Sequence, residues 1–179
     1  MLEVENTALV VIDVQEKFYR VMDEKESLLE NLQKLIKGIL VLNIPIIHTE
    51  QYPKGLGLTL PEISSHMPEI KPISKVAFSC CGEENFLQEL KKVNRKQLLV
   101  CGIESHVCVY QTVTDLLKAG YEVQVVVDVV TSRTGENKEI GLERMKAEGA
   151  KLTCIEMALF ELLKIAEGDA FKEISKIVK

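Results

Sequence analysis

TALVVID, residues 7–13, is the segment that decides the fold class of this chain. It is short, rich in β-branched residues and apolar until it ends at a carboxylate, which is the pattern of a strand covered on both faces. In the following segment, 23–42, apolar residues recur at helical spacing, and lysines and glutamates occupy the opposite side. The chain therefore begins with a strand followed by a helix.

The same strand and helix unit recurs through the rest of the chain. The alternation predicts an α/β fold, a three-layer α/β/α sandwich around a mainly parallel six-stranded sheet. We expect the strand order 3-2-1-4-5-6. The expected later strands are 45–49, 72–76, 97–102, 122–130 and 151–155, and the expected later helices are 106–118, 136–148 and 157–166.

The region from residue 50 to residue 81 departs from this alternation. Its four prolines and a nearby pair of glycines interrupt any long element. We therefore expect a long loop over residues 51–72, which is either a wall of a substrate site or a solvated connector. The C-terminal segment 169–179 has apolar residues at helical spacing, and it could pack on a neighbouring subunit or on its own domain.

Composition narrows the classes of function. The chain has 179 residues, 46% of them hydrophobic and 27% charged, so we expect a single domain over residues 1–179. The formal net charge of -5 makes nucleic acid a poor partner. The longest apolar runs are far shorter than a membrane span, and no signal peptide is evident, so a cytoplasmic protein is expected.

The five cysteines have no spacing typical of a zinc site, so we expect neither a metal nor another cofactor. Cys101 and Cys154 lie in apolar runs and are expected to be small buried residues. A disulfide between the adjacent Cys80 and Cys81 would be strained. The thiols are therefore predicted to be reduced.

Three residues near the carboxyl ends of predicted strands could carry chemistry. In a parallel sheet these ends lie together, which would bring Asp13, Lys75 and Cys108 to one crevice. With Ser105 as the N-cap, Cys108 would lie near the start of a helix, where the helix dipole and the Lys75 ammonium favour a thiolate. Asp13 would act as a proton acceptor. Taken singly, such an aspartate is usually a solvated loop residue and such a lysine is usually exposed.

Three motifs give this set of residues a more specific meaning. Together with further matches over nearly the whole chain, they make it resemble the isochorismatase-like cysteine hydrolases, and most of all the isochorismatase-domain-containing subgroup. The resemblance implies a catalytic triad of Asp13, Lys75 and Cys108. The three motifs are IDVQEKF (12–18), SKVAFS (74–79) and GIESHVCV (102–109), and the further matches are HTEQYPKGLG (48–57), DVVTSR (128–133) and EMALFELL (156–163).

The resemblance also implies features around the catalytic residues. A non-proline cis peptide is expected between Ile103 and Glu104, and it would direct the amides of Glu104 and Cys108 towards one point as an oxyanion hole. The substrate-binding residues suggested by the motifs are Gln15, Phe18, Gln51 and Tyr52, although each of these could equally be a packing or loop residue. The family further implies a homo-oligomer.

Departures from the family pattern bear on the substrate. Nicotinamidases of this family carry an Asp-x-His metal motif where this chain has His48, Thr49, Glu50 and Gln51, so neither a metal nor nicotinamide is expected. His48 is either structural or a pocket-lining hydrogen-bond donor. His106 replaces an acidic residue common beside the family cysteine. Founding members hydrolyse a vinyl ether without needing a cysteine, so a cysteine nucleophile favours cleavage of a C–N bond in a small amide or ureide.

Two other classes of function stay open. A protein of the same fold could bind a small molecule or a partner without turnover, because fold alone does not fix function. Alternatively, Cys108 could be a thiol redox sensor. The complete set of Asp13, Lys75 and Cys108 favours a small-molecule hydrolase over both.

Overall fold

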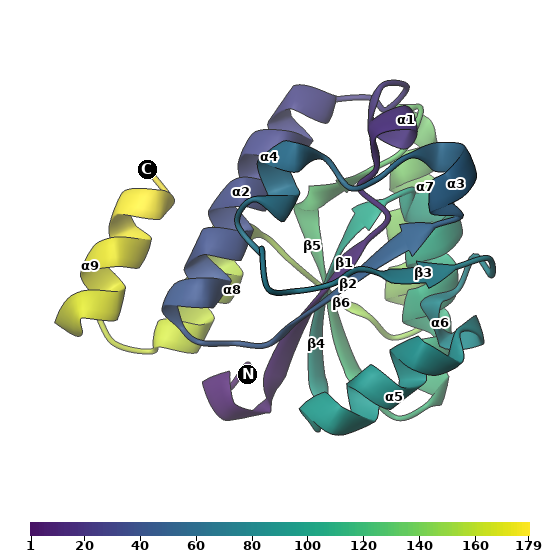
Figure 1. The fold of residues 1–179 in the computed structure, drawn as a ribbon. Coiled ribbons are helices and arrows are strands. Elements are labelled where there is room, and N and C mark those ends of the chain that lie inside the picture. The colour runs from purple at the N-terminus through teal and green to yellow at the C-terminus, as the bar shows by residue number, and fades with distance from the viewer.

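The computed structural model describes all residues, 1–179, and arranges them in three layers (Figure 1). The central sheet has six strands in the order β3-β2-β1-β4-β5-β6, and every pair of neighbours is parallel. The predicted fold class and strand order are thus confirmed. The strands are β1 (Thr7–Ile12), β2 (Ile46–Gln51), β3 (Ile73–Lys75), β4 (Gln97–Ile103), β5 (Glu122–Thr131) and β6 (Lys151–Thr153).

Helices cover both faces of the sheet, which explains why β1 and β4 are buried at every position. One face carries α2 (Lys25–Val41), α8 (Ile155–Leu163) and α9 (Gly168–Ile177), and the other carries α5 (Glu84–Val93), α6 (Tyr110–Lys118) and α7 (Gly135–Ala147) (Figure 1). Short helices follow the first two strands, namely α1 (Glu16–Tyr19), α3 (Pro53–Leu56) and α4 (Pro61–Ser64). No helix combines the length and apolar character that crossing a bilayer requires.

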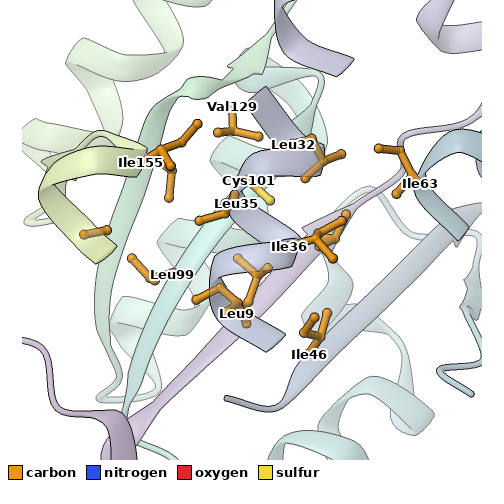
Figure 2. Close-up of a cluster of buried hydrophobic side chains, with 14 of the residues drawn as sticks. Leu9, Leu32, Leu35, Ile36, Ile46, Ile63, Leu99, Cys101, Val129 and Ile155 are labelled. Atoms are coloured by element: carbon orange, nitrogen blue, oxygen red, sulfur yellow. The ribbon is translucent and has the colours of Figure 1, made fainter. Parts of the chain in front are cut away.

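A hydrophobic core lies on each side of the sheet. In the first core, Leu32, Leu35 and Ile36 of α2 pack against sheet residues such as Leu9 and Leu99 (Figure 2). These positions of α2 carry the helical period seen in the sequence. The first core therefore holds α2 across the middle of the sheet.

The second core uses the alternate residues of the same strands. Val10 and Val100 point to this side, and they cluster with Phe86 of α5 and Val113 of α6. Because successive residues of a strand face opposite sides, one apolar strand supplies both cores. The continuous apolar runs in the sequence follow from this arrangement.

The expected long loop is more structured than predicted. It contains α3 and α4, and Pro53 and Pro61 begin these helices. Proline suits the first turn of a helix because its fixed φ angle is helical and its missing N–H has no partner there. The prolines thus start single helical turns in addition to interrupting longer elements. β2 also extends to Gln51, past its predicted end.

The C-terminal helix α9 packs on its own subunit. Ile174 is fully buried in the first core, and the rings of Phe160 and Phe171 lie 6.4 Å apart between centroids. Its neighbours are α2 and α8. The sequence left open whether this segment packs on its own domain or on a neighbouring subunit, and in the structure it packs on its own domain.

Gly102 allows β4 to approach β1 closely. Its φ angle is +119°, and a Cβ atom there would lie 2.1 Å from the Ile12 carbonyl oxygen. We expect Gly102→Ala to lower the free energy of unfolding by about 3 kcal/mol, because both the backbone conformation and the space exclude a side chain. Urea unfolding would measure the loss. Gly149 is the matched control, since its φ of +108° is similar but a Cβ atom there would meet no other atom within 4 Å.

Gly149→Ala should therefore lower the free energy of unfolding only by the strain in its backbone conformation. A loss for Gly102→Ala no larger than that for Gly149→Ala would contradict the steric explanation.

Candidate active site

The candidate site lies at the carboxyl ends of three strands, next to the point where strand order reverses between β1 and β4. Asp13 directly follows β1, Lys75 is the last residue of β3, and Cys108 lies in the turn after β4. The backbone of Asp13 is left-handed, with φ of 54°, which is uncommon for a residue other than glycine. β2 separates β1 from β3, so the long side chain of Lys75 is needed to reach Asp13.

Asp13 and Lys75 form a buried ion pair. The Nζ of Lys75 lies 2.7 Å from Oδ2 of Asp13, and neither side chain is exposed to solvent. The hydroxyl of Thr49 donates to Oδ1 at 2.8 Å. Burial raises the pKa of the Asp13 carboxyl above its ordinary value, although Lys75 and Thr49 both act in the opposite direction. A carboxylate with a raised pKa is a stronger base, which suits a proton acceptor.

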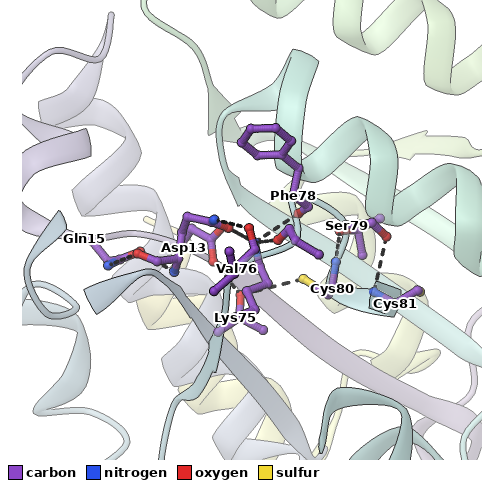
Figure 3. Close-up of polar contacts among 12 residues, drawn as sticks. Asp13, Gln15, Lys75, Val76, Phe78, Ser79, Cys80 and Cys81 are labelled. Atoms are coloured by element: carbon purple, nitrogen blue, oxygen red, sulfur yellow. Dashed lines mark hydrogen bonds and ion pairs between the residues drawn. The ribbon is translucent and has the colours of Figure 1, made fainter. Parts of the chain in front are cut away.

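The ammonium group of Lys75 is held by several acceptors besides Asp13 (Figure 3). It donates to Oε1 of Gln51 at 2.6 Å, to the Phe78 carbonyl at 3.0 Å and to the Ala77 carbonyl at 3.2 Å. An ammonium has three protons, so these acceptors use all of its donors. Lys75 is therefore fixed in position, and it has no spare proton for a substrate.

Gln15 and Gln51 form a scaffold behind this pair. The Gln15 amide group donates to the carbonyls of Gln51 at 3.0 Å and Gly57 at 2.6 Å, and its oxygen accepts from the Gln51 amide at 2.7 Å. The Gln51 side chain also donates to the Val76 carbonyl at 2.7 Å. The motifs suggest both glutamines as substrate contacts. In the structure their polar groups are used within the protein, and sequence reasoning missed that Gln51 binds Lys75.

The side chains of the other two residues suggested as substrate contacts make no hydrogen bond to the buried pair, although the Tyr52 backbone amide donates to the Lys75 carbonyl at 2.8 Å. Phe18 packs partly against the first core. Tyr52 is 53% exposed, and it lies between Gln51 and α3 with a positive φ of 36°. Of the two, the position of Tyr52 fits a site wall better, because its exposed ring follows directly after the strand that carries Gln51.

Cys108 lies in a turn of π-helix, Ser105–Val109, that leads into α6. The predicted N-cap role of Ser105 is wrong, because its hydroxyl donates to the Thr131 carbonyl at 3.0 Å and the N-cap position belongs to Glu104. No side chain caps this turn. The peptide bond between Ile103 and Glu104 is cis. The amides of the turn are thus left without a side-chain acceptor.

The thiol of Cys108 does not ionise as readily as the sequence led us to expect. Burial and then the charge of Asp13 raise its pKa, and the opposing effect of Lys75 is smaller. Only 3% of the residue is exposed. This direction is opposite to the thiolate expected from the helix start and the lysine, because that expectation did not include the loss of water on burial. Asp13 and Lys75 both contribute to this pKa shift, in opposite directions.

A second thiol lies behind the pair. Cys80 is fully buried, its Sγ is 3.8 Å from the Thr49 hydroxyl, and burial followed by the Asp13 charge raises its pKa to about 12. It belongs to the short 3-10 turn Cys80–Gly82, and neither Cys80 nor Cys81 forms a disulfide. Sequence reasoning gave Cys80 no place in the site. Its position directly after the SKVAFS motif was the available signal.

The histidines that the sequence left open lie outside the ion pair. The Nδ1 of His106 is 2.9 Å from the Ser132 hydroxyl, and the Nε2 of His48 is 2.6 Å from the Thr59 hydroxyl. No group of three or more His, Cys, Asp or Glu side chains is arranged to hold a metal ion. Both histidines therefore have a structural hydrogen bond.

Buried thiols should make the protein less stable in alkali. Burial raises the pKa of Cys101 well above its ordinary value of 9.0, so this thiol stays protonated in the folded state and ionises on unfolding. The resulting stabilisation is complete below pH 9 and is lost as the pH rises towards the folded pKa. Between about pH 7 and about pH 10.5, the free energy of unfolding should fall in both proteins. We expect this fall to be about 2 kcal/mol smaller in Cys101→Val than in the wild type. Urea unfolding at both pH values measures this, and equal losses would contradict it.

Comparisons with known proteins show which family the chain resembles. Residues 7–157 match the model of the isochorismatase domain. The chain is 38% identical over 180 residues to the secreted isochorismatase effector Isc1 of Phytophthora sojae (strain P6497), covering 97% of this chain and 85% of that protein. It is 36% identical over 178 residues to isochorismatase domain-containing protein 2 of Danio rerio, covering 99% and 89%.

A solved structure is also similar over nearly the full length. It is described as the MAR1 ribonuclease from Caenorhabditis elegans, with a TM-score of 0.93 and 38% sequence identity, and the match covers 99% of this chain and 91% of that one. The similarity therefore extends to the fold and to the whole sequence.

Proposed function

The chain belongs to the isochorismatase family of hydrolases, and we propose that it cleaves a C–N bond in a small amide or ureide with Cys108 as nucleophile. The observation that carries the proposal is the buried pair of Asp13 and Lys75, 2.7 Å apart, whose charges act on the Cys108 thiol. A nucleophile, a base and a group that orients the base are the parts that covalent hydrolysis needs. The proposed catalytic unit is the domain formed by residues 1–179.

In the first half of the reaction, Asp13 accepts the thiol proton while the sulfur of Cys108 attacks the substrate carbonyl carbon. The tetrahedral oxyanion is held by the backbone amides of Glu104 and Cys108. Asp13 then gives its proton to the leaving nitrogen, the C–N bond breaks, and ammonia or an amine departs. An acyl-thioester on Cys108 remains.

In the second half, Asp13 removes a proton from water, and the resulting hydroxide attacks the thioester carbonyl. Collapse of this second intermediate expels the Cys108 thiolate, which regains the proton from Asp13, and releases a carboxylic acid. Lys75 keeps the Asp13 carboxylate in position through both halves. Burial raises the pKa values of both Asp13 and Cys108, which favours transfer of the thiol proton only once substrate is in place.

The raised pKa of Cys108 also bears on the alternatives. A redox sensor requires an accessible thiol with appreciable thiolate at neutral pH, whereas this thiol is buried and burial raises its pKa. A binding protein without turnover would have no need of a buried ion pair beside a cysteine. Hydrolysis accounts for both features.

We further propose that the protein works as a homo-oligomer. Val76 and Phe78 lie one and three residues after the catalytic Lys75, yet they are 77% and 55% exposed. The cavities of about 590, 540 and 330 Å³ are lined by residues other than Asp13, Lys75 and Cys108. A second copy that covers Val76 and Phe78 would bury this apolar surface and enclose the mouth of the site.

A small molecule is the proposed substrate, although the relative from Caenorhabditis elegans is described as a ribonuclease. The net charge of -5 would repel a phosphate backbone. The test is a screen of small amides and ureides, with a single-stranded RNA included, that follows release of ammonia or amine and of shortened RNA. Turnover of an amide or ureide supports the proposal. Cleavage of RNA together with inactivity on every amide and ureide would contradict it.

A further inference from the structure

Strand β2 presents polar groups to both faces of the sheet. Thr49 and Gln51 point to the side of the ion pair, where they bind Asp13 and Lys75. His48 and Glu50 alternate with them, so they point to the opposite side. The register agrees, because His48 lies beside Val11, a residue of the first core. The second set of polar groups is thus separated from the proposed nucleophile by the sheet.

A cavity of about 590 Å³ opens on this opposite side, and residues of α4 form part of its lining. His48, Glu50 and Thr59 supply its buried polar wall, and Leu58 and Met67 supply apolar surface. A neighbouring cavity of about 330 Å³ is also lined by His48. The volume of the larger cavity is within the usual range for small-molecule sites.

Hydrogen bonding fixes the protonation of His48. Thr59 donates twice to Oε1 of Glu50, from its backbone amide at 2.7 Å and from its hydroxyl at 2.8 Å. A threonine hydroxyl has only one proton, so its oxygen must accept from Nε2–H of His48, 2.6 Å away. Desolvation by burial also lowers the pKa of His48, although the Glu50 charge opposes it, and this favours a neutral ring. Nδ1 of His48 is therefore an unprotonated acceptor.

Two acceptors on residues that line this cavity have no donor. Nδ1 of His48 is one of two buried side-chain nitrogen or oxygen atoms in the chain that lack a hydrogen-bond partner. Oε2 of Glu50 accepts no hydrogen bond, because both bonds from Thr59 go to Oε1. Glu50 also forms no ion pair, although Lys71 lines the same cavity. The carboxylate is otherwise enclosed, with 4% of the residue exposed, so a cation at Oε2 would offset the cost of its burial.

We propose that this cavity is a second binding site, separate from the Cys108 centre, for a small primary amine in its ammonium form. One N–H of the ammonium donates to Oε2 of Glu50, and another donates to Nδ1 of His48. The alkyl part packs against Leu58 and Met67. An ammonium suits these two acceptors in charge and in the number of donors, because it offers three donors and a positive charge.

The probe for this proposal is n-butylammonium chloride, titrated into the full-length protein. The readout is the 15N resonance of His48 Nδ1, which changes when the bare nitrogen accepts a hydrogen bond. We expect a saturable shift. The neutral n-butanol and the cation butyltrimethylammonium, which has no N–H, should both bind at least about tenfold more weakly, since neither can donate a charge-assisted N–H hydrogen bond.

Variants separate this site from the catalytic one. Glu50→Gln should weaken butylammonium binding at least about tenfold, whereas Cys108→Ala should leave it unchanged. If Glu50→Gln does not fold, Leu58→Lys takes its place, because Leu58 is 64% exposed and a lysine there would bring its own ammonium to Glu50. Leu58→Lys should block the probe, and the uncharged Leu58→Gln should not.

Three results would overturn the proposal. The first is the absence of a saturable His48 shift, which would leave an ordered water as the partner of Nδ1. The second is equal binding of butanol, which would mean that the cavity recognises only the alkyl chain. The third is loss of binding in Cys108→Ala, which would place the probe in the catalytic site. Failure of the hydrolase proposal would leave the predicted His48 shift unchanged.

Discussion

Replacing Cys108 with alanine is expected to lower the rate of amide or ureide hydrolysis by at least about 10³-fold, because the proposed acyl intermediate forms on its sulfur. The fold should survive, since the change removes one sulfur atom from a buried position. The measurement is kcat/KM on the best substrate of the screen, together with circular dichroism and a melting curve for both proteins.

Two other cysteine variants make this result specific. Cys101→Ala removes a thiol from the first core, on the opposite face of the sheet, and should leave kcat/KM almost unchanged. Cys80→Ala removes the thiol nearest to Thr49 and should keep activity within about tenfold of the wild type, since Cys80 is completely enclosed. Loss of activity in Cys80→Ala with retention in Cys108→Ala would show that Cys108 is not the nucleophile.

Replacing Lys75 with methionine is expected to lower the free energy of unfolding by about 3–5 kcal/mol near neutral pH and to abolish turnover. The methionine fills much of the space of the lysine but leaves the Asp13 carboxylate buried without its cation. Gln51 and the carbonyls of Ala77 and Phe78 also lose their donor. Urea unfolding and kcat/KM measure the two effects.

The matched control is Lys176→Met. Lys176 pairs with Glu173 at 2.7 Å on the surface, where both side chains are more than half exposed, at 70% and 55%. Such a pair contributes no more than about 1 kcal/mol. The double variant Asp13→Leu/Lys75→Met should recover part of the stability but no activity, because it removes both buried charges. A loss for Lys75→Met as small as that for Lys176→Met would contradict the importance of the buried pair.

The fold could be predicted from the sequence because each strand is marked by a local pattern. Residues 7–12 are apolar almost throughout, and α2 carries a clear helical period, so strand and helix could be told apart without tertiary information. The single turns α3 and α4 were missed because they are too short to show a period. The close contact at Gly102 was also missed, since it depends on how far β1 lies from β4.

The candidate site was predicted less completely. Asp13, Lys75 and Cys108 could be picked out because each lies at or after the end of a strand. The bond from Lys75 to Gln51 depends on the parallel register of β2 and β3, which places these two residues side by side. Residues 49 and 51 lie on the same face of β2. This spacing was the signal in the sequence that could have indicated the contact between Gln51 and Lys75.

The ionisation of Cys108 could not be predicted in the same way. The sequence identifies neighbouring charges, but it gives no measure of how much water the thiol loses on folding. In the structure this loss is the largest influence on the pKa of Cys108, and it outweighs the effect of Lys75. The same holds for Asp13, whose pKa rises through burial despite its ion pair.

The central claim is that Cys108 forms a covalent acyl-thioester during turnover, and intact-protein mass spectrometry after rapid acid quenching tests it most directly. The account predicts a mass increase equal to the acyl group of the substrate, located by peptide digestion on Cys108 and absent from Cys108→Ala. Steady turnover with the acyl group on another residue, such as Cys80, would contradict it. So would steady turnover with no acylated protein and no hydroxamate product when hydroxylamine is added to intercept the thioester.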